Sequence, residues 1–185
     1  MGNELDTRLA GLIDRQAIAD CLARFCRGMD RFDRDAYLSA FHADAEIAAG
    51  PFVGSAADCW DWAMPLHDQA QSLTHHVLLQ SSIDVDGDTA HGETYYQFIG
   101  RNRDDSVIMA GGRYIDRFER RDGAWRIALR VNVIEWSVMP PAVAIPFADV
   151  PDIAANGVSA RGREDPSYQR PLVNRRARQR PDAAL

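Results

Sequence analysis

Two Asp-Gly turns, placed between long segments of alternating character, constrain the fold of this chain more than any other feature. Val-Asp-Gly-Asp at 85–88 and Arg-Asp-Gly at 121–123 each have the composition of a tight β-hairpin turn. Together with a polar turn at 102–105, they predict four strands, over 76–85, 89–101, 107–120 and 125–138. The second half of the chain is therefore predicted to form an antiparallel meander.

Helical periodicity precedes these strands. Asp14 is predicted to be the N-cap of a helix that runs to about Met29. One apolar face of this helix is formed by Ile18, Leu22, Phe25 and Met29. Two further helices are predicted over 33–42 and 55–71, with a short strand at 45–54 between them. Helices followed by an antiparallel meander indicate an α+β fold, with the helices against one face of the sheet.

The chain divides at Pro140 and Pro141, which end the last predicted strand. We expect one domain over 1–139 and an extended, Pro- and Arg-rich arm over 140–185. There is no run of 18 apolar residues and no signal-peptide pattern at the N-terminus, so we expect a cytoplasmic protein without a membrane partner.

Charge and composition exclude several functions. The formal net charge is −6, although residues 161–185 hold seven arginines and three acidic residues. The remaining acidic body disfavours nucleic-acid binding, and we expect the basic arm to lie across a neighbouring acidic subunit. The chain contains no lysine, which excludes a lysine Schiff base or nucleophile. Its three cysteines lack metal-ligand spacing, so neither a zinc site nor a disulfide framework is expected.

Polar residues within apolar surroundings mark the candidate site. Asp30 closes the first predicted helix, and His75 and His76 begin the first long strand. Arg130 and Asn132 share one face of the last strand, because side chains two apart point the same way. A carboxylate beside a histidine fixes its tautomer and stabilises the imidazolium, which suits a general base. A nearby guanidinium can bind a leaving group or a developing oxyanion.

The sequence resembles the SnoaL-like branch of the nuclear transport factor 2 superfamily over roughly residues 5–138. The resemblance rests on the segment 18–25, on Asp30, Asp33, Phe41 and 44–45, on the segments 74–76, 85–90 and 111–114, and on Arg-Arg-Asp-Gly-Ala-Trp-Arg-Ile at 120–127. It implies a cone-shaped α+β barrel, in which a strongly curved, mixed, mainly antiparallel sheet wraps three N-terminal helices around a deep pocket. Similar enzymes include lindane dehydrochlorinase, scytalone dehydratase, bile-acid 7α-dehydratase and lignin-dimer deformylating lyases.

The resemblance also implies roles for particular residues. Asp30 matches an Asp that orients a catalytic His, and counting back from the Gly87 turn favours His76 for that His, with His75 as the alternative. Arg130 matches an arginine that serves the leaving group. Phe25 stands where the dehydrochlorinase has a lysine, which disfavours a chloride-leaving substrate. The substrate-binding residues expected around this triad are Phe25, Trp60, His75, Tyr96, Phe98, Tyr114, Asn132 and Ile134.

Three functions fit these residues. The first is a cofactor-independent lyase that acts on a small hydrophobic, aromatic or cyclic substrate and releases water or a small carbonyl such as formaldehyde. The second is an isomerase or cyclase that uses the same pocket. The third is a non-catalytic ligand-binding protein or a subunit like the small subunit of a dioxygenase, which the combination of Asp30, His76 and Arg130 argues against. Members of the superfamily commonly form dimers or trimers, so we expect a homodimer or homotrimer with the arm as a clasp.

Overall fold

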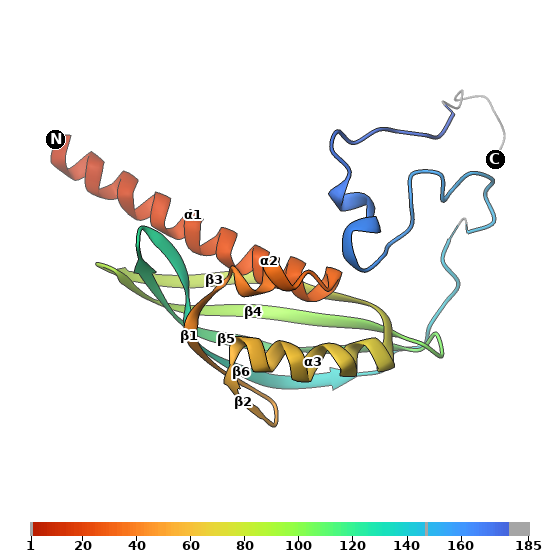
Figure 1. The fold of residues 1–185 in the computed structure, drawn as a ribbon, viewed down its shortest axis with the longest axis horizontal. Helices are drawn as coiled ribbons and strands as arrows, with labels where there is room; N and C mark the ends of the chain where they lie inside the picture. Colours follow the sequence, from red (N-terminus) through yellow and green to blue (C-terminus); the bar gives the residue numbers. More distant parts are fainter. Residues whose placement is uncertain (1, 147, 178–185) are drawn as a thin grey trace.

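The computed structural model of the protein describes residues 2–146 and 148–177. Within these residues the chain forms three α-helices and one six-stranded sheet (Figure 1). The helices are α1 (Gly2–Arg31), α2 (Arg34–Leu38) and α3 (Ala56–Ala70). The strands are β1 (Phe41–Ala49), β2 (Phe52–Ser55), β3 (Gln71–Asp86), β4 (Thr89–Asn102), β5 (Val107–Arg121) and β6 (Ala124–Val138). The predicted α+β class is confirmed.

The sheet is mixed, with the strand order β2-β1-β6-β5-β4-β3. Strands β3 to β6 form the predicted antiparallel meander, and β1 pairs in parallel with β6. This parallel pair places the early strand β1 beside the last strand, with Ile47 opposite Arg130. The long strands curve beneath α1 and beside α3, so the helices cover the concave face of the sheet (Figure 1).

A bulge between Gly111 and Gly112 contributes to that curvature. Across it, Gly111 lies opposite Trp136 and Gly112 lies opposite Ile134, so β6 has one extra residue. Bulges increase the local bend and twist of a strand pair. At Gly112 a Cβ atom would lie 1.9 Å from the carbonyl oxygen of Val133, so only glycine fits this close approach.

The first helix is longer than its sequence pattern predicts. It begins at Gly2 and not at Asp14, so the predicted N-cap is wrong. The Asp14 carboxylate instead accepts hydrogen bonds from the Trp125 indole and the Arg120 guanidinium, both at 2.8 Å. These contacts tie the middle of α1 to the β5–β6 hairpin. No helix of the described residues is long and apolar enough to cross a membrane.

The second helix is shorter than predicted, since α2 ends at Leu38 and β1 begins at Phe41. The carbonyl of Ala40 accepts a hydrogen bond from the Ile127 amide of β6 at 2.9 Å, and this pairing takes the chain out of the helix. Gly28 lets α1 and α2 approach closely, because a Cβ atom there would lie 2.4 Å from the Tyr37 amide nitrogen. This close contact between Gly28 and Tyr37 packs the last turns of α1 against α2.

The chain after β6 runs beyond the sheet and then returns (Figure 1). Its first part leaves Val143 and Ile145 exposed. Its second part packs on the ends of α1 and α3 through two short 3₁₀ helices, η1 (Gly162–Glu164) and η2 (Pro166–Tyr168). An intersubunit role for this arm stays a prediction.

Candidate active site

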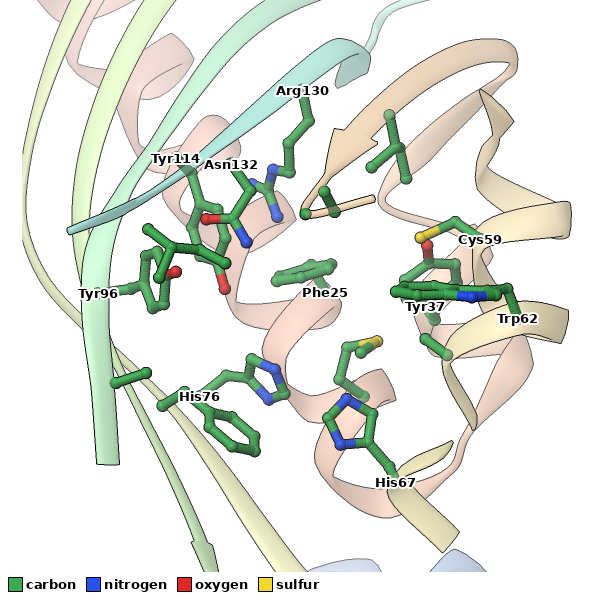
Figure 2. Close-up of a pocket in the computed structure, with 18 of the residues that line it drawn as sticks. Phe25, Tyr37, Cys59, Trp62, His67, His76, Tyr96, Tyr114, Arg130 and Asn132 are labelled. Carbon is green, nitrogen blue, oxygen red and sulfur yellow. The ribbon is translucent and has the colours of Figure 1, made fainter. Parts of the chain in front are cut away.

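A cavity of about 270 Å³ lies between α1, α3 and the inner face of the sheet (Figure 2). Most of its wall is aromatic or aliphatic. Of the residues expected there, the structure places Phe25, His76, Tyr96, Phe98, Tyr114, Arg130, Asn132 and Ile134 on the wall. A few polar groups set in an apolar cavity are typical of a small-molecule site.

Asp30 and His76 form a largely buried pair at this wall. Asp30 lies in the last turn of α1, and its Oδ1 is 2.7 Å from Nδ1 of His76 in β3. The same carboxylate accepts hydrogen bonds from the His76 amide at 2.9 Å and from the Thr74 hydroxyl at 3.1 Å. A carboxylate oxygen accepts from Nδ1 of His76, so in the neutral imidazole the proton lies on Nδ1 and Nε2 keeps its lone pair.

Aromatic rings enclose the His76 imidazole. The ring centroid of Phe98 lies 5.1 Å from that of His76, and the ring of Phe25 meets it edge-on at 6.0 Å. The His76 side chain is only 7% exposed. The imidazole therefore meets the cavity from an apolar setting, in which a charge that develops on it interacts strongly with Asp30.

Arg130 is the largest fully buried side chain of the described residues. Its Nε and Nη2 atoms donate to the two carboxylate oxygens of Asp116, both at 2.7 Å. The guanidinium also lies between the rings of Phe25 and Tyr114, at 4.2 and 4.1 Å. Burial disfavours its charge, but the Asp116 carboxylate outweighs burial and raises the pKa of Arg130 above its ordinary value. The guanidinium is therefore a permanent cation.

Two polar atoms at this end of the cavity, one of them on the Arg130 guanidinium itself, have no hydrogen-bond partner among the described residues. They are Nη1 of Arg130 and Oδ1 of Asn132, both buried. These side chains are two residues apart on β6 and point into the cavity together, as their spacing predicts (Figure 2). Buried polar atoms are nearly always hydrogen-bonded, so this pair marks a position where a ligand can supply both an acceptor and a donor.

Tyr96 and Tyr114 stack on each other beside this position, with ring centroids 4.2 Å apart. Burial raises the pKa of both phenols above the ordinary value. Both hydroxyls are therefore protonated near neutral pH and can act as hydrogen-bond donors.

The chain matches the model of the SnoaL-like domain family over residues 10–131. It belongs to the SnoaL-like family. This SnoaL-like domain resembles the solved structure of hexachlorocyclohexane dehydrochlorinase LinA type 2, with a TM-score of 0.67 and 21% identity over 75% of this chain and 98% of that chain. A scytalone dehydratase-like protein from Novosphingobium aromaticivorans has a TM-score of 0.63 and 19% identity, over 72% and 92% of the two chains. The Mycobacterium tuberculosis protein Rv3472, of unknown function, has a TM-score of 0.62 and 25% identity, over 79% and 85%. No curated protein matches the chain at a significant level.

Two residues expected in the pocket of this SnoaL-like domain lie elsewhere. His75 is exposed, because side chains alternate along β3 and His76 takes the inward position. Trp60 lies on a different side of α3 and packs in the core against Tyr37, with ring centroids 5.1 Å apart. Each helical residue is rotated by about 100° from the next, so Trp60 points away from the cavity that its neighbour Cys59 lines.

The residues that the sequence did not assign to the pocket include Cys59, Ala63 and His67. Their spacing of four places them on one face of α3, and this periodicity was the available signal. Asp116 was also missed, because nothing local shows that it lies opposite Arg130 in the β5–β6 register. Among the described residues no group of three or more His, Cys, Asp or Glu side chains is arranged to hold a metal ion.

Proposed function

We propose that this SnoaL-like protein is a cofactor-independent lyase that acts on a small hydrophobic substrate with an aromatic or cyclic skeleton. His76 is the general base, Asp30 orients it, and Arg130 stabilises the departing group. The observation that carries the proposal is the 2.7 Å contact between Asp30 Oδ1 and His76 Nδ1, which leaves Nε2 of His76 as a base beside an apolar cavity. A base positioned in this way contributes about 10²–10⁴-fold to a rate.

Loss of water follows directly from these groups. Nε2 of His76 takes a proton from a substrate carbon, and the C–H electron pair becomes the new C=C bond. The C–O pair leaves with the oxygen, which takes the proton back from the imidazolium and departs as water. Nη1 of Arg130, which has no partner among the described residues, donates to the oxygen on which negative charge develops.

Loss of formaldehyde uses the same groups. Nε2 of His76 takes the proton from a hydroxymethyl O–H, and that electron pair becomes the C=O bond of formaldehyde. The broken C–C pair stays on the larger fragment, which takes the proton back from the imidazolium. Phe25 lies between His76 and Arg130, at the position where the family resemblance implies a lysine in the dehydrochlorinase. Arg130 is therefore the one cation among the described residues that line the cavity. This favours an oxygen or carbonyl leaving group over a halide.

A mass-resolved substrate screen tests the proposal. The protein is incubated with a panel of hydroxylated aromatic and cyclic alcohols, and products are identified by mass spectrometry. A lyase gives products lighter by water or formaldehyde, whereas an isomerase or cyclase conserves the substrate mass. Conservation of mass in every turned-over substrate would therefore reject the lyase in favour of the isomerase.

Variants at the pair assign the base. His76→Ala should lower turnover by about 10²–10⁴-fold. Asp30→Asn should lower turnover less, because this variant loses the carboxylate that orients His76 but keeps the base itself. Circular dichroism and the melting temperature should show that both variants fold. Full activity in folded His76→Ala protein would exclude His76 as the base.

A further inference from the structure

His67 is a second histidine in the cavity wall, and the proposed reaction gives it no role. It lies near the end of α3 and meets the His76 ring edge-on, with centroids 6.1 Å apart. The Phe98 ring lies 5.5 Å from it. Figure 2 shows His67 and Arg130 on opposite sides of Phe25, so the two polar side chains lie at different ends of the cavity.

A chain of hydrogen bonds runs from His67 to the protein surface. Nδ1 of His67 lies 3.0 Å from Oε1 of Gln71, and Nε2 of Gln71 lies 3.2 Å from Oδ1 of Asn102. Nδ2 of Asn102 lies 2.9 Å from the Ser106 hydroxyl. That hydroxyl lies 2.6 Å from the carboxylate of Asp104.

The carboxylate fixes the direction of every bond in this chain. Hydrogen bonds from the hydroxyl and amide of Ser106 lower the pKa of Asp104, so it is ionised and only accepts. Ser106 must therefore donate its one proton to Asp104 and accept from Asn102. Asn102 then uses its NH₂ group toward Ser106 and its oxygen toward Gln71. Gln71 in turn presents its oxygen to His67.

The consequence is a fixed tautomer at His67. Its Nδ1 carries the proton that Gln71 Oε1 accepts, so Nε2 holds a lone pair. Burial lowers the pKa of His67, and the nearby His76 and Arg161 act in the same direction, against Gln71 and Asp30. The ring is therefore neutral near neutral pH. No hydrogen bond to Nε2 is found within the part of the chain that the structure describes.

The C-terminal arm holds this histidine in place. Arg161 donates from Nη2 to the carbonyls of His67 at 3.1 Å and Gln71 at 2.7 Å. Its Nη1 pairs with Asp68 at 2.5 Å, and its guanidinium lies over the Phe32 ring at 4.0 Å. Both the backbone and the Nδ1 side of the imidazole are thus fixed, which leaves Nε2 as the side that faces a ligand.

We propose that His67 accepts a hydrogen bond from a hydroxyl group of the substrate and thereby selects hydroxylated aromatic compounds over their unsubstituted analogues. The bound hydroxyl lies at the α3 end of the cavity, and the leaving group lies at the Arg130 end. His76 lies on the same side of Phe25 as His67, beside the substrate atom that loses a proton (Figure 2). The inference rests on the proposed function only in placing the substrate in this cavity.

Binding of a matched pair of probes tests the role of His67. Beta-naphthol and beta-methylnaphthalene share a ring system. Beta-naphthol carries a hydroxyl group at the position where beta-methylnaphthalene carries a methyl group. Wild-type protein should bind beta-naphthol more tightly by roughly 3- to 10-fold, as one added hydrogen bond predicts. His67→Phe should reduce that ratio to about one while keeping its affinity for beta-methylnaphthalene. A wild-type ratio of one, or an unchanged ratio in folded His67→Phe protein, would overturn the proposal.

Three variants separate His67 from the other polar groups. Asn132→Leu removes the unpartnered acceptor at the other end of the cavity, and His76→Ala removes the second imidazole. His75→Phe, at an exposed histidine outside the cavity, is the matched control and should keep the preference for beta-naphthol. If Asn132→Leu or His76→Ala loses it and His67→Phe keeps it, the hydroxyl binds Asn132 or His76 and the proposal is wrong. The binding measurement needs no turnover, so a substrate screen without products would leave the role of His67 intact. Equally, a failure of the His67 test would leave the proposed lyase activity intact.

The tautomer is measured directly by long-range ¹H–¹⁵N correlation in protein labelled at histidine. His67 should carry its proton on Nδ1 in the wild type, and Gln71→Leu should abolish that preference by removing the acceptor. A proton on Nε2 in the wild type would contradict the hydrogen-bond direction from which the proposal is derived.

Discussion

At the scale of single residues, Asp30 is a hydrogen-bond acceptor for three groups of β3. The His76 imidazole, the His76 amide and the Thr74 hydroxyl all converge on its carboxylate. A carboxylate at a helix C-terminus meets the unfavourable end of the helix dipole, so these donors offset an electrostatic cost. The same contacts lock the orientation of the imidazole, which is what a general base requires.

Arg130 combines two roles at this scale, because two of its nitrogens pair with Asp116 and the third faces the cavity. Asp116→Asn should destabilise the fold by about 3–5 kcal/mol, since a buried cation loses its counter-charge. Urea unfolding gives the value. Glu135→Gln, at the more exposed pair with Arg113, is the matched control and should have a much smaller effect.

The double variant Arg130→Met with Asp116→Leu separates stability from chemistry. Apolar replacement of a whole buried pair is often neutral or stabilising, so much of the lost stability should return. Turnover should stay low, because the donor for the leaving group is gone. An Asp116→Asn variant as stable as Glu135→Gln would show that this pair is not the buried anchor that its geometry indicates.

At the scale of elements, the second half of the arm is fastened to the helices by Asp165. Its carboxylate pairs with Arg31 at 3.3 Å and accepts from the amides of Ala160 at 3.0 Å and Ser167 at 2.9 Å. Burial opposes ionisation, but these hydrogen bonds and Arg31 lower the pKa of Asp165 from 3.8 to about 2. The arm therefore gains stability from an ionised Asp165.

The pH dependence of this fastening has a definite sign. Because the pKa is lowered in the folded state, the stabilisation is complete above the ordinary pKa and is lost as the pH falls toward about 2. Asp165→Asn should cost about 2 kcal/mol of unfolding free energy at neutral pH, and the difference from wild type should shrink below roughly pH 4. Denaturant unfolding of both proteins between about pH 2 and pH 7 measures this difference. Asp84→Asn, at an exposed position of β3, is the control. A difference that grows on acidification would contradict the assignment.

At the scale of the whole molecule, apolar surface remains exposed in the single chain. The first turns of α1 expose Leu5, Leu9 and Leu12, and the far end of β6 exposes Trp136 and Val138. Exposed apolar surface of this kind commonly marks an interface with another protein. We propose that the protein is a homodimer or homotrimer, with the early part of the arm as a clasp between subunits.

Deletion of residues 140–185 tests the clasp. The truncated protein should show a lower oligomeric state by light scattering, because it loses the segment that would span the subunit boundary. Asp165→Asn in the full chain is the control, since it loosens the second half of the arm and keeps its length. An unchanged oligomeric state after the deletion would assign assembly to the sheet and helices alone.

The sequence by itself determined the four strands of the meander and their turns, and its family resemblance indicated Asp30 with His76, with His75 as the alternative. Alternation along a strand and the chemistry of an Asp-Gly turn are local properties, so they can be recognised without the fold. The start of α1 was missed, because its first turns make few buried contacts and have no boundary signal beyond the predicted cap at Asp14. On α3, Trp60 was predicted to line the pocket, whereas the structure places its neighbour Cys59 there.

Only the tertiary structure decided which groups meet from distant parts of the chain. Asp116 faces Arg130 because of the register of β5 and β6, and His67 obtains its tautomer through residues more than thirty positions away. Hydrogen-bond direction depends on every partner in a series, ending at the Asp104 carboxylate. A sequence pattern shows the periodicity of one helix or strand. Which donors, acceptors and charges meet in this pocket depends on how separate helices and strands pack together.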